Sequence, residues 1–400
     1  MSAAVVMAGL AVSCPTAVAQ AQDAQHNQPQ PRAGGHSLDR SGVQVQATRG
    51  VPALPRALSG QAWAVTDART GQVLAAKNAH RRLAPASTLK ILFALTVLPK
   101  FPQNLVHEVT SEELTGIKPG SSLVGVQKYK RYQVADLWRG VFLSSGNDAV
   151  RTLAVMNGGW RATSIEMQAT ARRLGAHDTR VKSPDGYDTP GQVSSAHDLS
   201  VFARAGLADA DFARYASTVS ARFPAAGGRN SFGIRNTNRL LSGADGVARY
   251  RGLTGVKNGY TSRAGNTLVV TANRGGQKVL VAVMDPRSGR PQAVYEEARS
   301  LLDWGFAAVG KATPVGTLPT GSTTAVSDSR AGDHPPSSAS PRAAAKPESA
   351  SVSVSHTSTG HSRWPLAAAA LALVGGAAVL WRGRVRVPAR ARRPLRRRRG

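Results

Sequence analysis

Apolar residues mark out one long stretch, from about residue 58 to 311, that carries the periodicities of a folded domain. Near its start, residues 62–67 and 72–76 are short apolar runs on either side of Ala-Arg-Thr-Gly, a pattern typical of a β-hairpin. Helical spacing of apolar residues dominates the middle, and strand-like runs return near the end. Beyond the hairpin, the pattern predicts helices at 133–140, 149–156, 163–174, 195–207 and 292–306, and strands at 251–256, 265–272 and 278–284.

The order of these elements predicts the fold class. Two early strands, a helical block and three late strands are typical of an α+β domain. The early hairpin can join the late strands in one antiparallel sheet, with the helical block packed beside it. We therefore expect one α+β domain over residues 58–311.

The segment 85–95 is apolar on nearly every face and begins with Pro85, which predicts a helix buried in the core. Its first turn carries Ser87 and Lys90 three residues apart, and therefore on one face. Burial lowers the pKa of a lysine, and a neutral amine can take a proton from a nearby serine. The ordinary alternative is a helix cap at Ser87 with Lys90 extending to solvent, because Ser-x-x-Lys is a common pattern.

A second candidate motif lies in a loop between two predicted helices. Ser145 and Asn147, two residues apart, can project a hydroxyl and an amide from one turn. The alternative is an ordinary connecting turn in which Asp148 caps the next helix.

A third candidate lies on or beside a late strand. Lys257 is surrounded there by small residues that let a ligand approach the backbone. Asn258 and Gly259 also form a strong turn dipeptide, so a hairpin turn is the alternative.

Charge is the most unusual feature of the composition. The chain has 51 Lys and Arg against 23 Asp and Glu, a formal net charge of +28. Ten arginines and no acid lie in residues 382–400, which accounts for over a third of that excess. The other basic residues are scattered, and no RNP, zinc-finger or helix-turn-helix signature accompanies them. We therefore expect no nucleic-acid partner.

Cysteine content excludes several kinds of chemistry. The single cysteine, Cys14, lies in the predicted signal peptide. The mature protein would therefore lack a disulfide framework, a thiol nucleophile and a Cys-ligated metal.

The N-terminal flank resembles an export signal followed by a flexible segment. Residues 1–19 contain an apolar run and end in Ala-Val-Ala, which fits a signal-peptidase site. A lipoprotein signal at Cys14 is the weaker alternative, because alanine replaces the usual large aliphatic residue before it. Residues 20–57 are rich in Gln, Gly, Pro, Asp and Arg, which predicts a flexible segment.

The C-terminal flank predicts a membrane anchor. Residues 312–363 are dominated by Ser, Thr, Ala, Pro and Gly, which predicts a disordered tether. Residues 364–381 are apolar with tryptophan at both ends and would span ~27 Å as a helix. The arginine-rich tail at 382–400 then fits a cytoplasmic end, so we expect a protein held at the extracytoplasmic face of the membrane. A buried Ala-rich helix and an incomplete sortase signal at 318–321 are the alternatives.

The three candidate motifs are far more specific together than singly. Ser-x-x-Lys, Ser-x-Asn and Lys-x-Gly in this order form the trio of penicillin-binding proteins and class A β-lactamases. Residues 58–308 resemble the serine D-alanyl-D-alanine carboxypeptidases among the low-molecular-mass penicillin-binding proteins, peptidase family S11. Further segments resemble landmarks of that family, namely 183–187 (with Ser183 in place of Asn), 194–199, 236–241 and 302–306.

This resemblance implies a β-lactamase/transpeptidase-like fold and a specific hydrolysis. The enzyme would remove the terminal D-alanine from peptidoglycan stem peptides, with β-lactams as covalent inhibitors and no cofactor or metal. Ser87 would be the nucleophile, Lys90 the general base and Ser145 a proton relay. The backbone N–H groups of Ser87 and Tyr260 would form the oxyanion hole. The implied substrate-binding residues are Asn147, Lys257, Asn258, Gly259, Tyr260, Thr261 and Arg287.

One position departs from the family pattern. The family usually has Lys-Thr-Gly, whereas Asn258 occupies the threonine position here. The threonine hydroxyl is thought to hold the terminal carboxylate of the substrate, and an asparagine amide can donate to the same group. We expect activity to survive with altered substrate or β-lactam preference.

Four other functions were compared with this one. A Ser-His-Asp hydrolase is disfavoured because no Gly-x-Ser-x-Gly elbow is present. A β-lactamase shares the trio, but no Glu-x-x-x-Asn deacylating motif lies between Ser145 and Lys257. A D,D-endopeptidase would use the same site. A non-catalytic wall-binding protein is disfavoured by the intact serines and lysines of the trio.

Overall fold

The computed structural model describes residues 37–46, 48–225 and 230–320. The predicted signal peptide at 1–19, membrane helix at 364–381 and basic tail at 382–400 lie outside these residues. Within the described ranges, no helix combines the length and the apolar character needed to cross a bilayer.

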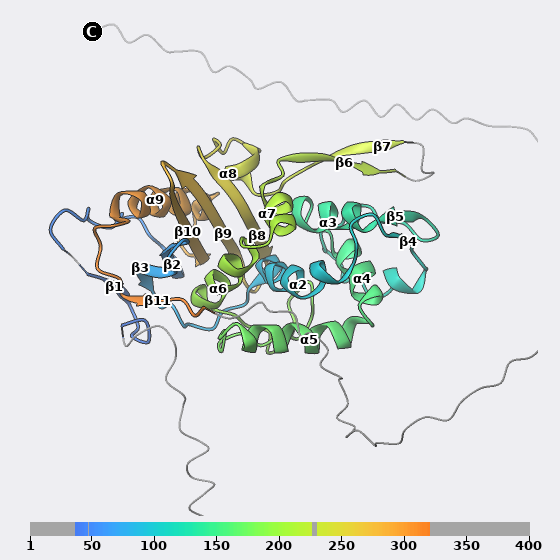
Figure 1. Cartoon of the computed structure of the whole chain (residues 1–400), viewed down its shortest axis with the longest axis horizontal. Coiled ribbons are helices and arrows are strands. Elements are labelled where there is room, and N and C mark those ends of the chain that lie inside the picture. The colour runs from blue at the N-terminus through green and yellow to red at the C-terminus, as the bar shows by residue number, and fades with distance from the viewer. Residues whose placement is uncertain (1–36, 47, 226–229, 321–400) are drawn as a thin grey trace, which may run out of the picture. The chain divides into compact units, whose positions relative to one another are not determined.

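The centre of the domain is an antiparallel sheet in the order β1-β3-β2-β10-β9-β8, with β11 also pairing with β3 (Figure 1). The early hairpin β2–β3 therefore joins the late strands directly, with Val65 opposite Val281. This confirms the predicted α+β class and its antiparallel sheet. The strands are β1 Val43–Val45, β2 Gly60–Asp67, β3 Gln72–Lys77, β8 Leu253–Thr261, β9 Gly265–Arg274, β10 Gln277–Pro286 and β11 Gly316–Thr317.

Alternation along the strands gives the sheet two apolar faces. On β10, Val281 and its neighbours two residues away belong to a core with α9 (Ala293–Ala308), which covers one face. Leu280 and Ala282 belong to a second core, shared with the helical block on the other face. Because successive side chains of a strand point to opposite faces, a strand buried on both faces is a continuous apolar run. That is the pattern that β10 shows.

The helical block surrounds α2 (Lys90–Val97), which extends from the short 3₁₀ helix η1 (Ala86–Leu89). Seven of the eight residues of α2 are buried, as its all-round apolar pattern predicted. The surrounding α-helices are α3 Val134–Leu143, α4 Asn147–Met156, α5 Trp160–Arg173, α6 Ala196–Gly206, α7 Ala210–Ser217 and α8 Arg239–Ser242. Two short 3₁₀ helices accompany them, η2 Leu98–Lys100 and η3 Glu112–Leu114. Two small two-stranded sheets complete this part, one of β4 Val106–Glu108 and β5 Arg131–Gln133, the other of β6 Ser220–Pro224 and β7 Ser231–Arg235.

The two flanking segments are more ordered than the sequence pattern predicted. Within 20–57, β1 pairs with β3, and Leu38 is only 1% exposed. Within 312–363, β11 also pairs with β3, and Leu318 is 1% exposed. Both short segments place apolar side chains in the domain core, which stabilises them there despite their polar neighbours.

The strand that carries Lys257 also differs from its prediction. The pattern predicted a strand ending at residue 256 and allowed a turn at Asn258-Gly259. Instead β8 continues through Thr261, and Asn258 pairs opposite Leu268 of β9. Ladder hydrogen bonds from β9 therefore override the local turn preference of this dipeptide.

Candidate active site

Ser87 and Lys90 meet at the junction of η1 and α2. Lys90 is the first residue of α2 and is 1% exposed. Its Nζ donates hydrogen bonds to Ser87 Oγ at 2.9 Å and to the backbone carbonyl of Asp185 at 2.6 Å. The lysine is therefore held against the serine hydroxyl and does not extend to solvent.

Burial changes the protonation of Lys90. Desolvation lowers the pKa of Lys90 to about 8, although the carboxylates of Asp185 and Asp148 partly oppose that shift. With such a pKa, roughly one lysine in ten is neutral at pH 7. A neutral amine retains a lone pair for the serine proton while donating to the Asp185 carbonyl. The pair can therefore act as a nucleophile and its general base.

Backbone contacts lock η1 from two sides. Ala86 has a positive φ of 48°. A Cβ on Gly186 would lie 2.0 Å from the carbonyl oxygen of Ala86, and one on Gly259 would lie 2.6 Å from the backbone nitrogen of Ser87. Only glycine permits these approaches, since it alone has no Cβ. Gly259 of β8 thereby brings the backbone of its neighbour, Tyr260, beside the nucleophile.

Ser145 and Asn147 come from the connection between α3 and α4. Ser145 has a φ of 56° and is 6% exposed, and its Oγ forms no hydrogen bond with any residue that the structure describes. Asn147 Nδ2 donates to Ser121 Oγ and Asp185 Oδ2, both at 3.1 Å. A buried hydroxyl without a partner carries a desolvation cost of about 1–3 kcal/mol, so Ser145 is poised to bond a ligand.

Asp148 holds the neighbouring loop in place. Its Oδ2 accepts hydrogen bonds from the backbone N–H groups of Gly125 at 2.7 Å and Val126 at 2.8 Å. Its Oδ1 accepts one from the N–H of Val124 at 3.0 Å. This carboxylate fixes the segment after Ser122, and no local sequence pattern pointed to that role.

Lys257 is the second buried amine of the site. It is 2% exposed, and its Nζ donates to the backbone carbonyl of Asn258 at 2.8 Å. Burial, and then the positive charge of Lys90, lower the pKa of Lys257 well below its ordinary value. The charge of Lys90 therefore disfavours protonation of Lys257, which is consistent with two neighbouring amines that share little positive charge.

A cavity of about 190 Å³ opens in front of Ser87. Four residues predicted from the sequence line it together, namely Ser87, Asn147, Tyr260 and Thr261. Its other lining residues are Pro119, Gly120, Ser121, Ser122, Asp185, Gly186, Tyr187, Asp188 and Ser262. The segment 183–187 was predicted only as a family landmark. No local sequence signal points to the role of Asp185, whose carbonyl contacts Lys90 and whose carboxylate contacts Asn147.

Four predicted binding residues, Lys257, Asn258, Gly259 and Arg287, are not among the residues that line this cavity. Asn258 is half-buried, and its Oδ1 accepts a hydrogen bond from Thr237 Oγ1 at 2.9 Å. Arg287 forms an ion pair with Asp285 at 2.5 Å. Thr261 does line the cavity, and its Oγ1 donates to Asp188 Oδ1 at 2.7 Å.

One group of described residues has the composition of a metal site. His80, Asp178 and His197 bring potential ligand atoms within 4.8 Å of one another. His80 Nδ1 is hydrogen-bonded to Asp178 Oδ2 at 2.7 Å, and His197 Nδ1 to Asp198 Oδ1 at 3.1 Å. None of these three residues lines the cavity at Ser87.

Comparison with known proteins gives a consistent result. A family model described as D-alanyl-D-alanine carboxypeptidase, peptidase S11, matches residues 48–288. The chain is 38% identical over 262 residues to D-alanyl-D-alanine carboxypeptidase DacB2 of Mycobacterium tuberculosis, covering 64% of this chain and 86% of that protein. It is 32% identical over 264 residues to DacD of Escherichia coli, covering 63% of this chain and 64% of that longer relative.

Solved structures share the fold. The D-alanyl-D-alanine carboxypeptidase of Mycobacterium tuberculosis superimposes with a TM-score of 0.62 at 38% identity, covering 69% of this chain and all (100%) of that one. The Streptomyces K15 DD-transpeptidase superimposes with a TM-score of 0.59 at 26% identity, covering 64% of this chain and 100% of that one. The sheet and helical block described above are therefore those of a transpeptidase-like α+β fold.

Proposed function

Because this chain belongs to the peptidase S11 family of D-alanyl-D-alanine carboxypeptidases, we propose that it removes the terminal D-alanine from peptidoglycan stem peptides through an acyl-enzyme on Ser87. The observation that carries the proposal is the contact of 2.9 Å between Lys90 Nζ and Ser87 Oγ, made by a buried amine whose pKa falls to about 8. A buried amine with a lowered pKa in hydrogen-bond contact with a hydroxyl is an arrangement typical of a catalytic base and its nucleophile.

The first step is acylation. Ser87 Oγ forms a bond to the carbonyl carbon of the penultimate D-alanine, and its proton passes to neutral Lys90. The backbone N–H groups of Ser87 and Tyr260 stabilise the oxyanion, and losing one such donor typically costs roughly 10²–10³ in rate. The C–N bond to the terminal D-alanine then breaks. The proton held by Lys90 passes through the hydroxyl of Ser145, with help from Lys257, to the leaving amine, which returns Lys90 to its neutral form. The Ser145 hydroxyl has no partner among the described residues and is available for this relay.

The second step is hydrolysis. Water attacks the carbonyl carbon of the ester on Ser87, and neutral Lys90 takes a proton from the water. Lys90 then gives this proton to Ser87 Oγ as the ester bond breaks and the shortened peptide leaves. Asn147 holds the peptide of the substrate during both steps. When protonated, Lys257 raises the positive potential for the terminal carboxylate.

The terminal carboxylate has an unusual set of donors in this proposal. Asn258 replaces the usual threonine, and its Oδ1 already accepts from Thr237, which leaves the amide Nδ2 as the donor for a ligand. The hydroxyl of Thr261 donates to Asp188 and must turn to bind a carboxylate. Because the carboxylate would be held by the Asn258 amide and a reoriented Thr261 hydroxyl, substrate preference would differ from that of relatives with threonine at position 258.

The deciding experiment is intact-mass spectrometry of the full chain in mild detergent, with benzylpenicillin, combined with an assay for D-alanine release from a peptide ending in D-Ala-D-Ala. We expect a one-to-one adduct on Ser87, release of D-alanine, and neither in Ser87→Ala. Absence of both in the wild-type chain would leave a non-catalytic wall-binding protein.

Other outcomes separate the related activities. An adduct that is lost rapidly as penicilloate would identify a β-lactamase. Cleavage of cross-linked muropeptides in preference to stem peptides would identify a D,D-endopeptidase. Transfer of the acyl group to an added amino acid in preference to water would match the activity named for the Streptomyces relative.

We propose further that the enzyme acts at the extracytoplasmic face of the membrane. The supporting pattern is the apolar segment 364–381 with its flanking tryptophans and the following arginines. Extraction of membranes with alkaline carbonate tests this anchor. We expect the full chain to stay with the membrane and a chain without residues 364–400 to be released.

A further inference from the structure

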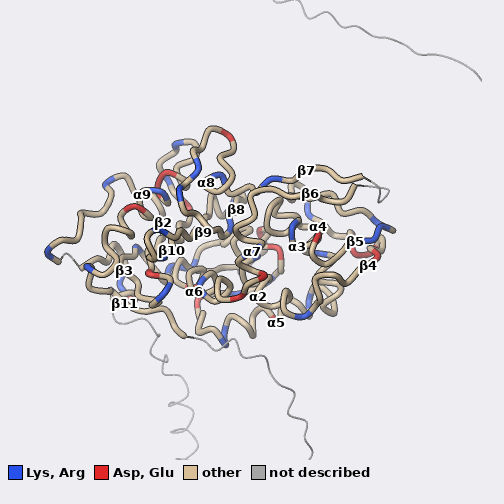
Figure 2. The backbone as a smooth tube through the Cα atoms, turned by 45° about the horizontal axis from the view of Figure 1, so that its top comes forward, with Lys and Arg blue, Asp and Glu red and all other residues tan. Residues whose placement is uncertain are grey.

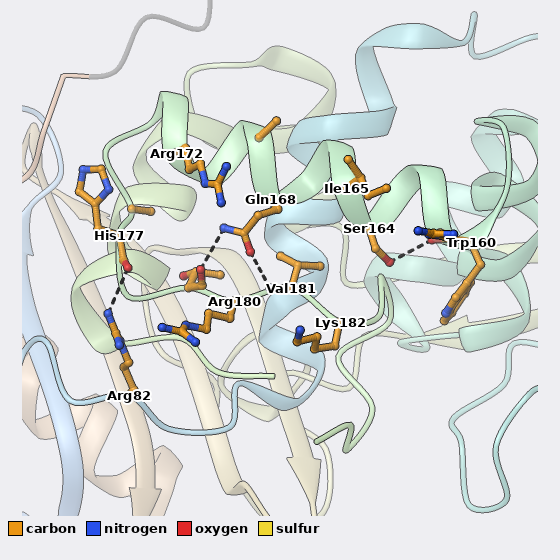
Figure 3. A pocket seen from close by; sticks show the side chains of 14 residues that line it. Arg82, Trp160, Ser164, Ile165, Gln168, Arg172, His177, Arg180, Val181 and Lys182 are labelled. Carbon is orange, nitrogen blue, oxygen red and sulfur yellow. Dashed lines mark hydrogen bonds between the residues drawn. The ribbon is translucent and has the colours of Figure 1, made fainter. Parts of the chain in front are cut away.

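A basic groove lies apart from the cavity at Ser87. It encloses about 870 Å³ between α5 and the segment 176–182 (Figure 3). In the part of the chain that the structure describes, the two cavities share no lining residue. The groove is lined by Arg82, Trp160, Arg161, Ser164, Ile165, Gln168, Ala169, Arg172, Ala176, His177, Thr179, Arg180, Val181 and Lys182.

The lining contains five cationic side chains and no carboxylate. Arg161 and Arg172 project from α5, whereas Arg180 and Lys182 project from the facing segment, and all four are exposed. None of these four forms an ion pair or a side-chain hydrogen bond with another described residue. Arg82, at one end, lies 3.7 Å from Asp178. Basic residues on and around α5 are also visible along the backbone in Figure 2.

Acids near the groove are directed elsewhere. The only acid on α5, Glu166, forms an ion pair with Lys100 and accepts a hydrogen bond from Asn157 at 2.9 Å. Asp178 is 1% exposed and bonds to His80 and Ser195. Apart from Arg82, which lies near Asp178, the cations of the groove are therefore not paired with nearby acids, unlike those of an ordinary surface with interspersed signs.

Hydrogen bonds hold the two walls in register. Gln168 of α5 donates from Nε2 to the carbonyl of Thr179 at 3.0 Å and accepts at Oε1 from the N–H of Val181 at 2.9 Å. Arg82 Nη2 donates to the carbonyl of His177 at 3.4 Å. A groove fixed in this way costs little conformational entropy when a ligand binds.

The arrangement of the cations indicates the chemistry of the ligand. Arg161 and Arg172 are eleven residues apart on α5, which separates them by ~16 Å along the helix axis. A single small anion cannot contact both, whereas a chain with repeated charges can. Arginine, which outnumbers lysine here, binds phosphate in a bidentate manner.

Two alternative polyanions fit less well. A bilayer presents a flat charged surface, whereas these cations line a concave groove. Single-stranded nucleic acid needs large aromatic platforms, but the one tryptophan in the lining, Trp160, has the Arg151 guanidinium 4.7 Å from its ring, and the other ring is the small imidazole of His177. We propose that this groove binds a linear polymer of non-aromatic phosphodiesters, independently of the proposed hydrolysis at Ser87.

Arginine footprinting of the full chain tests this proposal at individual residues. Short linear polyphosphate is the probe, phenylglyoxal modifies exposed arginines, and peptide mass spectrometry gives the modification at each one. We expect protection of Arg161, Arg172 and Arg180, with no protection of the exposed control arginines Arg56 and Arg251. Because each peptide is measured separately, the arginines of 382–400 do not obscure the result.

Matched double variants sharpen the test. Arg172→Ala with Arg180→Ala should weaken the polyphosphate protection of Arg161 about tenfold or more, because two charge-assisted contacts are lost. Arg56→Ala with Arg251→Ala removes the same charge and should leave that protection unchanged. Both variants should be acylated by penicillin at the wild-type rate, which separates this proposal from the one for Ser87. Protection should also fall steeply between 50 and 200 mM salt, as counterion release requires.

Several results would overturn the proposal. Equal protection by inorganic phosphate at the same phosphate concentration would mean a small-anion site. Protection of the groove by vesicles of anionic lipid, and not by polyphosphate, would mean a membrane-facing surface. Stronger protection by single-stranded DNA than by polyphosphate would mean base recognition. Protection confined to residues 382–400 would mean that the groove binds nothing of this class.

Discussion

The two faces of the central sheet are built from the same strands but differ in the polar groups buried against them. Under α9, the face is apolar around Trp63, Val281 and Leu301, and its buried acid, Glu297, is satisfied by Ser59 Oγ at 2.5 Å and the N–H of Gly60 at 2.9 Å. The opposite face carries two buried amines, Lys90 and Lys257, without a carboxylate bonded directly to either.

The second face also holds backbone conformations that non-glycine residues rarely adopt. Near the second face, Ala86 and Ser145 both have positive φ values, at 48° and 56°. Such conformations, like buried amines, cost stability and persist only where the surroundings hold them. The core under α9 is separate from these costly groups, so substitutions there should change folding, whereas substitutions of the buried amines should change chemistry.

The largest expected effect separates chemistry from folding. Lys90→Met should slow acylation of Ser87 by penicillin by about 10²–10⁴, because the general base is lost while the buried volume is kept. Stopped-flow or quenched mass spectrometry gives the rate, and circular dichroism checks that the fold is retained. A rate within tenfold of wild type would mean that another group accepts the proton.

The opposite behaviour is expected on the other face. Leu301→Ala should lower the free energy of unfolding by about 2–5 kcal/mol, because the side chain is fully buried under the sheet. Urea denaturation gives that change, with Leu301→Met as the volume-conserving control. The acylation rate per folded molecule should stay at the wild-type value. A matching loss of acylation would show that the core under α9 also affects the chemistry at Ser87.

The pH dependence tests the protonation of Lys90. Because the neutral amine is the active form and its pKa is about 8, the neutral fraction rises with pH. The second-order acylation rate should therefore increase about fivefold from pH 7 to pH 8 and level off above that. A profile that is flat or falls over this range would contradict the assignment of Lys90 as the base.

The smallest effect concerns the carboxylate donors. Asn258→Thr should lower KM for a D-Ala-D-Ala peptide by about two- to fivefold with a smaller change in kcat, because one hydrogen bond is improved in geometry. Asn258→Ala is the matched control and should raise KM. Steady-state D-alanine release measures both, and an unchanged KM in both variants would remove Asn258 from the binding site.

Local pattern was sufficient to predict most elements, whereas their neighbours in space depend on distant residues. Apolar spacing identified the buried helix α2 and the late strands. It could not show that β10 inserts between β2 and β9, nor that β1, three residues within a polar segment, pairs with β3. Ladder pairing with β9 also overrode the turn preference of Asn258-Gly259.

The same distinction holds for the site. Ser87 and Lys90 are visible in one turn of sequence, because helical geometry alone places them together. The Asp185 carbonyl that fixes Lys90 is 95 residues away, and Asp148 binds backbone groups 22–24 residues before it. Such contacts follow from the fold and have no local sequence signal.

The position of β3 has a practical consequence. Both β1 and β11 pair with it, so the described chain enters and leaves the domain at one end of the sheet. Four strand spacings, or ~19 Å, separate β3 from β8, the strand that carries Lys257. A surface, a fluorophore or a fusion partner attached through either of these strands would therefore leave the Ser87 cavity open to a substrate as large as a polymer.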